Sequence, residues 1–315
     1  MVRSSPVISV VSPAYKCSGC IEELHRRLVA VFKSMKISYE IIFVDDCSPM
    51  NDWEVICRVC EADSSVRGVK LSRNYGQHFA ITAGIDRAMG DWVVVMDCDL
   101  QDQPEEIPKL YAKALEGWPV VLARRGNRQD SVYRKFVSKF FSLIYSWLGD
   151  IKIDNSISNF SICSQKVIAT VRRFRERNRS FQMFLNEVGF PRTTIDVKHS
   201  SRFHGKSSYS FRKLVDFAIQ NIVAGSNKPL NLSVRFGFLL SMASLLYASY
   251  LIVRFYLYDV SVQGWTSLAV LISFLGGLGF ANLGILGLYL GKVFDEVKGR
   301  PLYVVETEIG DRRCD

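Results

Sequence analysis

The sequence predicts an α/β protein whose mostly parallel sheet carries helices on both faces and is followed by two C-terminal membrane helices. Short apolar strands alternate with amphipathic helices over residues 1–125, and two long segments near the C-terminus carry no charge. Strands that are uniformly hydrophobic are typical of parallel sheets buried on both sides. A chain of 315 residues that is 48% hydrophobic is long enough for one or two domains with a substantial core.

The elements of residues 1–125 follow from two periodicities. Each expected strand is an apolar run, and each expected helix has apolar residues three and four positions apart, most clearly in "IEELHRRLVAVFKSM". Ligands bind open α/β sheets beyond the carboxyl ends of the strands, so functional groups are expected there. The expected strands are 7–13, 39–46, 66–72, 91–97 and 119–125, and the expected helices are 21–35, 53–62, 78–90 and 104–117.

Two apolar segments predict the membrane helices. Residues 236–253 and residues 260–291 contain no charged side chain, and about 20 apolar residues span a bilayer. The alternative is a buried hairpin of soluble core helices. The small residues of "SFLGGLGFANLGILGLYLG" favour the membrane interpretation, because they permit close helix packing in lipid.

Charge predicts the orientation and limits the partners. The net charge of +9 favours an anionic partner such as phosphate, nucleic acid or an acidic membrane face, and composition does not choose among them. Two spans return the tail to the side that holds residues 1 to about 230. That part is strongly basic, whereas "RFYLYDVSVQGW" between the spans has one Arg and one Asp, so the N-terminal part is expected in the cytoplasm.

Eight cysteines include two CxxC pairs, Cys17 with Cys20 and Cys57 with Cys60. Such pairs raise zinc binding, disulfides and redox chemistry as alternatives. The second pair lies in an amphipathic stretch, where Cys serves as a small core group, and no signal peptide opens the chain. Reduced cytosolic thiols are therefore the preferred interpretation.

The stretch "VVVMDCDLQDQPEE", residues 93–106, sets a group of carboxylates directly after an apolar strand in a basic chain. Crowded carboxylates repel one another, so their persistence indicates a cation among them. Asp45 and Asp46 follow the second strand, "SRNYGQ" follows the third, and Arg124, Arg125 and Arg128 follow the fifth. Acids at two strand ends and arginines at a third suit a nucleotide diphosphate with a divalent cation. No GxxxxGK[ST] or GxGxxG motif is present, which disfavours a P-loop or a dinucleotide site.

Four blocks carry a family resemblance: "VVSPAYK", "EIIFVDDCS", "LSRNYGQHFAITAGIDRAMGDWVVVMDCDLQDQPEEIPKL" and "VVLARRGNRQD". In this order they resemble family 2 glycosyltransferases with a GT-A fold. The nearest group is that of polyisoprenyl-phosphate glycosyltransferases, which contains dolichol-phosphate mannose synthase and the bacterial undecaprenyl-phosphate sugar transferases. The resemblance covers nearly the whole chain, since the bacterial branch also has two C-terminal membrane helices. It implies inverting, metal-dependent transfer of one sugar from a nucleotide diphosphate sugar to a polyisoprenyl phosphate.

The resemblance also implies roles for individual residues on the donor side. The metal would be Mg²⁺ or Mn²⁺. The competing interpretation is that Asp97 caps a strand and that the later acids begin a helix at Pro104, which is adopted here for Glu105 and Glu106 alone. The implied nucleotide-binding residues are Pro13, Tyr15, Asp45, Asp46, Arg73 and Asp97, and the implied metal ligands are Asp97, Asp99 and Gln101.

On the acceptor side, the resemblance implies that an amphipathic helix at about 130–148 lies in the membrane interface and helps to bind the lipid phosphate. A second block, "SRFHGKSSYSFRKL", would close over the donor diphosphate, and its alternative is a basic surface turn. The basic run "RRFRERNR" at 172–179 is expected to be a solvated face near anionic headgroups. The acceptor residues are Arg125, Arg128, Arg134 and Ser138, and the diphosphate loop residues are Arg202, Gly205, Ser207 and Tyr209.

One departure affects the expected catalytic set of Asp99, Asn159 and Arg202. Many relatives carry an aspartate, proposed as general base, where this sequence has Asn159 in "SISNFSIC". An amide does not accept a proton at neutral pH. Either the base lies elsewhere, with Asp154 nearest, or none is needed because a phosphate monoester is mostly a dianion at pH 7. The second explanation is preferred.

Two other function classes stay open at this point. A processive family 2 polysaccharide synthase would share the same blocks, although it normally shows a QxxRW-like motif and more spans. A catalytically impaired relative could serve as a membrane scaffold. The expected partners are a nucleotide sugar, a polyisoprenyl phosphate and membrane lipids, with no nucleic acid, and the homo-oligomeric state is open.

The expected organisation has four parts in the inner (plasma) membrane. A cytoplasmic catalytic domain occupies residues 1–210, and a juxtamembrane amphipathic helix occupies 211–231. Two membrane helices lie within 232–291, and a cytoplasmic tail follows at 292–315.

Overall fold

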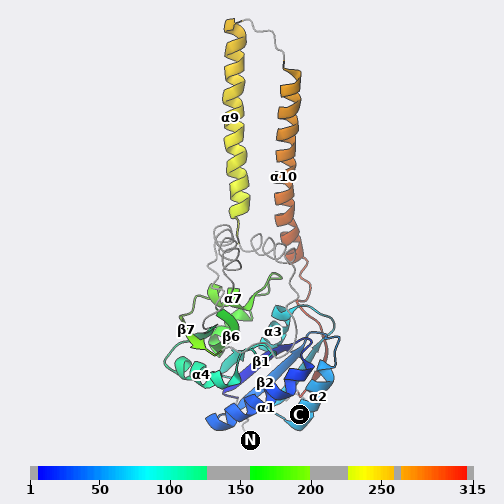
Figure 1. Cartoon of the computed structure of the whole chain (residues 1–315), viewed down its shortest axis with the longest axis vertical. Coiled ribbons are helices and arrows are strands. Elements are labelled where there is room, and N and C mark those ends of the chain that lie inside the picture. The colour runs from blue at the N-terminus through cyan, green and yellow to red at the C-terminus, as the bar shows by residue number, and fades with distance from the viewer. Residues whose placement is uncertain (1–5, 126–156, 199–225, 259–263, 311–315) are drawn as a thin grey trace. The chain divides into compact units, whose positions relative to one another are not determined.

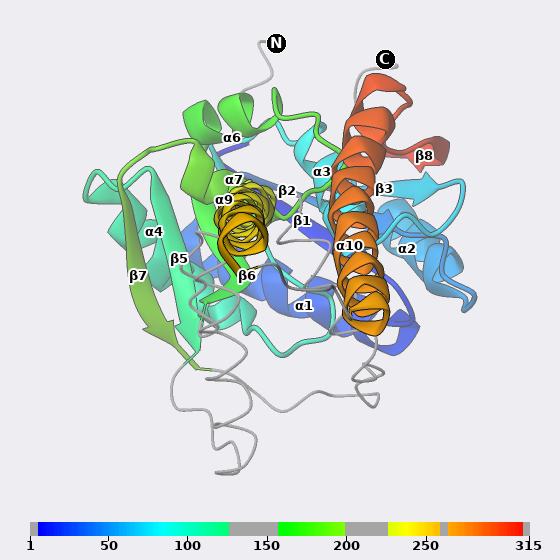
Figure 2. The ribbon, with the colours of Figure 1, turned by 90° about the horizontal axis from the view of Figure 1, so that it is seen from above.

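An eight-stranded sheet forms the centre of the first of two compact units. The computed structural model describes residues 6–125, 157–198, 226–258 and 264–310. The strands have the order β7-β5-β6-β4-β1-β2-β3-β8, and Figure 2 shows β7 at one edge and β8 at the other. The strands are β1 (Ile8–Ala14), β2 (Tyr39–Asp45), β3 (Val66–Leu71), β4 (Trp92–Val95), β5 (Val120–Arg125), β6 (Ile157–Ser164), β7 (Arg192–Val197) and β8 (Val305–Ile309).

The sheet is mostly parallel, as the sequence predicts. The pairs β1–β2, β1–β4, β2–β3 and β5–β7 run parallel, so β2, β1 and β4 present their carboxyl ends at one edge. Strand β6 lies antiparallel between β5 and β4, and β8 is antiparallel to β3. The continuous apolar run of β1 is explained by burial on both faces of the sheet, because β1 is buried along its whole length.

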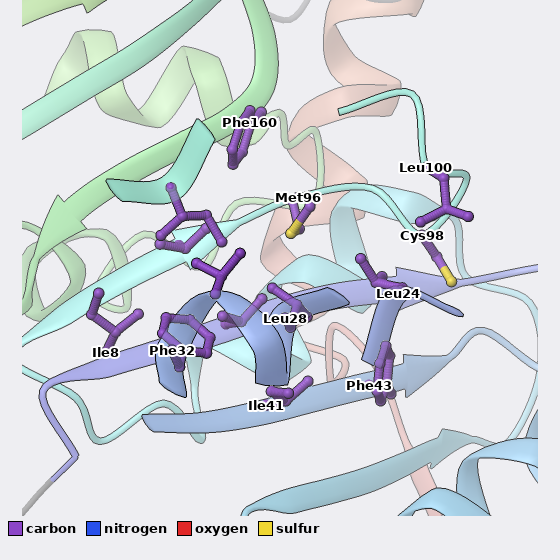
Figure 3. Close-up of a cluster of buried hydrophobic side chains, with 14 of the residues drawn as sticks. Ile8, Leu24, Leu28, Phe32, Ile41, Phe43, Met96, Cys98, Leu100 and Phe160 are labelled. Atoms are coloured by element: carbon purple, nitrogen blue, oxygen red, sulfur yellow. The ribbon is translucent and has the colours of Figure 1, made fainter. Parts of the chain in front are cut away.

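Helices cover both faces of the sheet and create two buried clusters. Figure 3 shows the first cluster, where Leu24, Leu28 and Phe32 pack against Ile41 and Phe43. The first cluster includes α1, α2 and α4, and the second includes α3, α6 and α7. The helices are α1 (Ser18–Met35), α2 (Asp52–Ala62), α3 (Gln77–Ile85), the 3₁₀ turn η1 (Pro104–Glu106), α4 (Ile107–Leu115), α6 (Gln165–Val171) and α7 (Phe181–Glu187).

All nine elements expected in residues 1–125 are present, and two of them, β4 and α3, are clearly shorter than expected. Helix α3 ends at Ile85, whereas the pattern predicts a helix to residue 90. The chain then passes close to β1, where a Cβ on Gly90 would lie 2.6 Å from the backbone nitrogen of Ser9. Beyond residue 125, the sequence patterns did not predict the strands β6, β7 and β8 or the helices α6 and α7.

The second unit contains the two long apolar helices α9 (Lys228–Tyr258) and α10 (Trp265–Val297), which Figure 1 shows running alongside each other. The stretches Lys228–Leu251 and Phe274–Val297 are long and apolar enough to cross a membrane. Large apolar side chains such as Phe238 and Phe280 are exposed, which suits a lipid environment. The expected interface helix at 130–148 and most of the juxtamembrane segment 211–231 lie outside the described residues.

Candidate functional site

Strained backbone marks the edge at which β1, β2 and β4 end. Lys16, Cys47 and Leu100 have φ values of 57°, 53° and 60°, and each lies in the connection that follows one of these strands. In the described part of the chain, one further residue other than glycine, Lys36, has a positive φ, and it ends helix α1. Such left-handed conformations are unfavourable for residues with a side chain and cluster at functional sites. The edge therefore has the backbone signature of a binding site.

Two buried acids, Asp45 and Asp46, lie at the carboxyl end of β2. Asp45 accepts a hydrogen bond from the backbone nitrogen of Ser48 at 2.9 Å, and burial raises the pKa of Asp45 to about 6. Asp46 accepts bonds from the backbone nitrogens of Tyr75 and Gly76, each at 2.8 Å. Burial also raises the pKa of Asp46. Asp46 thus ties the end of β2 to the connection between β3 and α3.

Asp97 is the centre of a hydrogen-bonded group at the end of β4. The amide nitrogen of Gln77 donates to its Oδ1 at 2.6 Å, and Asn159 contributes a second side-chain hydrogen bond. Burial first, and then the charges of Asp102 and Asp99, raise the pKa of Asp97 to about 6. Strand β6 brings Asn159 here because its antiparallel register with β4 pairs Val95 with Ser161. Asp97 lies two residues after Val95, and Asn159 lies two residues before Ser161, so the two residues come to the same end of the pair. The structure therefore brings Asp97, Asp99 and Asn159 together.

The donor set at this edge fits a divalent cation that takes its other ligands from a bound diphosphate. Asp97 and Asp99 supply carboxylate oxygens, Gln101 supplies an amide, and Gln101 donates its backbone nitrogen to Asp99 at 3.2 Å. Among the described residues no group of three or more His, Cys, Asp or Glu is arranged to hold a metal. Mg²⁺ is usually held by one or two carboxylates together with substrate phosphates. The crowding of carboxylates that raises the pKa of Asp97 is also the charge excess that a cation would offset.

Three further predicted nucleotide-binding residues lie around the same edge. Pro13 is buried near the end of β1, and Tyr15 follows it with its ring exposed. The guanidinium of Arg73 lies 4.4 Å from the ring centre of Tyr75, in the connection after β3. Stacking of this kind holds an arginine extended toward solvent, where an anion could reach it.

The arginines after β5 divide into two groups. Arg124 forms an ion pair with Asp196 of β7 at 2.6 Å, so it joins two neighbouring strands. Arg125 is the last residue of β5, and its side chain is not described. The other predicted acceptor and loop residues, together with the alternative base, lie outside the described residues: Arg128, Arg134, Ser138, Asp154, Arg202, Gly205, Ser207 and Tyr209.

The expectation of a solvated basic face at 172–179 is wrong for two of its arginines. Arg172 donates to the carbonyl oxygen of Ile85 at 2.9 Å, and Arg179 is buried, which lowers its pKa to about 10. Arg175 pairs with Asp86 at 2.8 Å. Helix α3 ends with carbonyl groups that lack helical partners, and arginine side chains satisfy such groups. The run therefore anchors the end of α3.

Two site residues were missed by the sequence prediction. Gln77 is the first residue of α3, directly after Gly76 with φ of 102°, and Asp102 is buried near Asp97. Both lie within the blocks that carry the family resemblance, but nothing in the local pattern separates them from their neighbours.

The CxxC cysteines lie on or next to α1 and α2, and burial raises the pKa of Cys60 to about 12, so this thiol stays protonated at neutral pH.

Comparison with known proteins shows the family to which the chain belongs. The model of the family "Glycosyl transferase family 2" matches residues 9–180. An uncharacterised glycosyltransferase of Synechocystis is 37% identical over 95% of this chain and 94% of its own length. The undecaprenyl-phosphate 4-deoxy-4-formamido-L-arabinose transferase of Pseudomonas syringae is 34% identical over 95% and 90%. That of Salmonella paratyphi A is 35% identical over 98% and 96%.

Solved structures support the same fold at low sequence identity. The mannosyltransferase PcManGT of Pyrobaculum calidifontis, in complex with GDP-Man and Mn²⁺, is 15% identical, with a TM-score of 0.50 over 93% of this chain and 88% of its own. The mannosyl-3-phosphoglycerate synthase of Rubrobacter xylanophilus is 15% identical, with a TM-score of 0.50 over 73% and 75%. The parallel sheet with an acidic site at its edge is thus the GT-A fold. The chain belongs to glycosyl transferase family 2 and is a glycosyltransferase.

Proposed function

We propose that the protein transfers a single sugar from a nucleotide diphosphate sugar to the phosphate of a polyisoprenol, with inversion at the anomeric carbon. The observation that carries the proposal is the group of Asp97, Asp99 and Asn159 at the carboxyl edge of a family 2 transferase sheet. Relatives that are 34% and 35% identical over nearly their whole length are named undecaprenyl-phosphate sugar transferases. Two apolar helices in the same chain suit an acceptor that resides in a membrane.

The acidic edge receives the donor in this proposal. Asp97, Asp99 and Gln101 would hold Mg²⁺ or Mn²⁺, and such an ion offsets the negative charge that develops on the departing diphosphate. Asp45 is buried with one oxygen bonded to Ser48, which leaves the other to accept a bond from the nucleotide base. Arg73 and Tyr15 are exposed beside it and would contact the nucleotide.

The acceptor is activated by its own charge. A phosphate monoester is mostly dianionic at pH 7, so one of its oxygens attacks the anomeric carbon without giving up a proton. The new carbon–oxygen bond forms on the face opposite the diphosphate while the old bond to that diphosphate breaks. Asn159 cannot act as a base, and its amide instead bonds Asp97. The predicted roles of Arg125, Arg128, Arg134 and Ser138 are to hold the lipid phosphate, and that of Arg202 is to stabilise the leaving group.

A multi-pass topology with a cytoplasmic catalytic domain accords with the sheet. Strand β8 follows α10 in sequence and pairs with β3, which precedes α9. The chain before the two apolar helices and the chain after them therefore form one sheet, and an even number of crossings satisfies this. Positive charge favours the cytoplasmic side for that sheet.

The test is an assay of the purified protein in detergent with undecaprenyl phosphate, a panel of radiolabelled nucleotide sugars, and Mn²⁺ either present or chelated. A radiolabelled, acid-labile lipid that carries one sugar, formed only with metal, is the expected product. A growing polymer would indicate a processive synthase, and absence of product with every donor would indicate a binding or scaffold protein.

Paired variants on the two sides of strand β4 test the metal assignment. Asp99→Ala should reduce transfer by at least about a hundredfold, because it removes a metal oxygen donor. Asp91→Ala is the matched control, since this exposed aspartate lies at the opposite end of β4. Near-normal transfer by the Asp99 variant would refute the metal assignment while leaving the family intact.

A further inference from the structure

The C-terminal tail, residues 300–310, completes the sheet of the transferase domain. Its strand β8 pairs antiparallel with β3, matching Gly68 with Ile309 and Leu71 with Val305. The two strands are in direct contact, because a Cβ on Gly68 would lie 2.9 Å from Cγ1 of Ile309. Tyr303 and Val305 pack against the buried cluster that also contains α3. The tail is thus an integral layer of the domain, although it follows both apolar helices in sequence.

Buried charge makes this contact specific. Glu308 pairs with Arg67 at 3.0 Å and with Arg87 at 2.9 Å, and the Arg67 side chain is 1% exposed. The Tyr303 hydroxyl donates to Asp86, at the end of α3, at 2.7 Å. A buried guanidinium strongly requires a nearby anion. Displacement of the tail would therefore separate Arg67 and Arg87 from Glu308.

The tail also reaches the donor side of the site. We call residues 72–76 the β3–α3 loop. The carbonyl oxygen of Val304 accepts a bond from the backbone nitrogen of Ser72 at 2.9 Å, and the backbone of Val304 also bonds the Tyr75 hydroxyl oxygen. On its other side, Asp46 accepts bonds from the backbone nitrogens of Tyr75 and Gly76. The loop is therefore held from two directions, by β2 and by the tail.

The residues that the loop carries are those expected to meet the donor. Arg73 lies within the loop, stacked on Tyr75, and Gln77 follows it at the start of α3 and bonds Asp97. Movement of the loop would move both side chains. Asp46 bonds the backbone at the end of the loop, and Val304 bonds the backbone at its beginning, so the tail supplies a second point of attachment.

We propose that the C-terminal tail is a positioning element of the donor site, which holds the β3–α3 loop so that Arg73 and Gln77 are directed at the donor diphosphate and Asp97. This inference rests on the proposed function, because it assumes that a nucleotide sugar binds at this edge. The tail itself contacts no substrate in this scheme. It acts through the loop, and its effect should be confined to the donor.

The test compares two glutamates of β8 in the full-length protein in detergent. Glu308→Gln removes the charge of a carboxylate that pairs with both Arg67 and Arg87, and it leaves Arg67 with Glu40 at 3.8 Å. Glu306→Gln instead changes an exposed residue that pairs with Lys70 on the surface. Calorimetry measures the Kd of UDP and of GDP with Mn²⁺, and the transfer assay measures KM for donor and acceptor separately. Glu308→Gln should raise the nucleotide Kd and the donor KM roughly tenfold and leave the acceptor KM unchanged, and Glu306→Gln should match the wild type.

A second variant covers the case in which Glu308→Gln fails to fold. Tyr303→Phe retains the ring in the core and removes only the hydroxyl that bonds Asp86, so it should raise the nucleotide Kd by a smaller factor, roughly threefold. Wild-type nucleotide binding in every folded tail variant would overturn the inference, as would an equal rise in donor and acceptor KM. Nucleotide binding needs no acceptor, so a wild-type protein that binds UDP or GDP but transfers nothing contradicts the proposed function alone. A wild-type protein that binds neither nucleotide overturns both.

Discussion

The side-chain amide of Gln77 donates a hydrogen bond to Oδ1 of Asp97 at 2.6 Å. Gln77 begins α3 and Asp97 follows β4, so the start of a helix is directed at the end of a strand. Asn159 of β6 provides a second side-chain bond to the same carboxylate. Two neutral amides therefore orient Asp97 without neutralising it. A carboxylate held in this way keeps its negative charge available to a cation.

Loss of the Gln77 amide should weaken metal binding. Residues that orient a metal ligand typically contribute about 10- to 100-fold in metal affinity. We expect Gln77→Leu to lower the affinity for Mn²⁺, in the presence of nucleoside diphosphate, by at least about tenfold, measured by electron paramagnetic resonance. Gln182→Leu is the control, because its amide bonds a backbone carbonyl of Ile157. Equal Mn²⁺ affinity in the two variants would show that Gln77 does not orient the site.

Replacement of Asn159 by aspartate separates a positioning role from a need for a base. Asn159→Asp would place a further carboxylate against Asp97, whose pKa is already raised to about 6. Like charges raise the pKa further, so transfer near pH 7 should fall several-fold and recover at higher pH. If the reaction instead needs a general base that Asn159 does not provide, the same variant would be faster at pH 7, because aspartate can act as that base. Asn159→Ser, which adds no charge, should show no such shift of the pH profile.

Transfer by the wild-type protein should be lost as the pH falls through about 6. Asp45 and Asp97 both have pKa values raised to about 6, chiefly by burial, and the proposed function needs both in their ionised forms, which exist above that pH. Metal competes with protons for a carboxylate ligand. If protonation of Asp97 causes the loss of transfer, excess Mn²⁺ will shift that loss to lower pH. If protonation of Asp45 causes it, the nucleotide affinity will fall over the same pH range and Mn²⁺ will not shift the loss. Loss of transfer only near the ordinary carboxylate pKa, about 4, would contradict both assignments.

Local patterns were enough to predict the first half of the sheet and the acidic edge. Strands β1, β2 and β4 are short apolar runs, and parallel strands order their ends at one edge, so acids after β2 and β4 had to lie near each other. The family resemblance supplied the roles that physical reasoning could not. It named Asp97 and Asp99 as a pair, and the structure brings them together at the end of β4.

The strands β7 and β8 could not be predicted, because their stability depends on distant partners. Strand β8 reads "VETEI", in which Glu306 and Glu308 are unusual for a strand. Their partners are Lys70 and Arg67, more than two hundred residues earlier. The contact between Asn159 and Asp97 likewise depends on β6 entering the sheet antiparallel between β5 and β4. No window of local sequence contains such information.

The placement of the basic run at 172–179 was wrong for a related reason. Charge alone indicates a solvated face, but Arg172 and Arg179 lie where α3 ends and α7 begins. Arg179 lies 5.9 Å from the ring centre of Phe79 and 5.1 Å from that of Phe184. An arginine can be buried when carbonyl oxygens accept its hydrogen bonds and aromatic rings lie against its guanidinium. The sequence run does not reveal those partners.

One of the groups beside Arg179 should make the protein sensitive to acid. Burial, followed by the charge of Arg179, lowers the pKa of His78 from 6.5 to about 4. The unfolded chain therefore binds a proton between about pH 6.5 and pH 4 that the folded protein does not, so the contribution of His78 to stability is present above pH 6.5 and is lost as the pH falls. Between about pH 7.5 and pH 5 the loss amounts to about 2 kcal/mol. Thermal unfolding of His78→Gln and wild type at both pH values measures this difference, because glutamine retains an acceptor for the backbone nitrogen of Phe181 and does not titrate. The variant should lose less stability at the lower pH than the wild type, and parallel losses would place His78 outside the acid response.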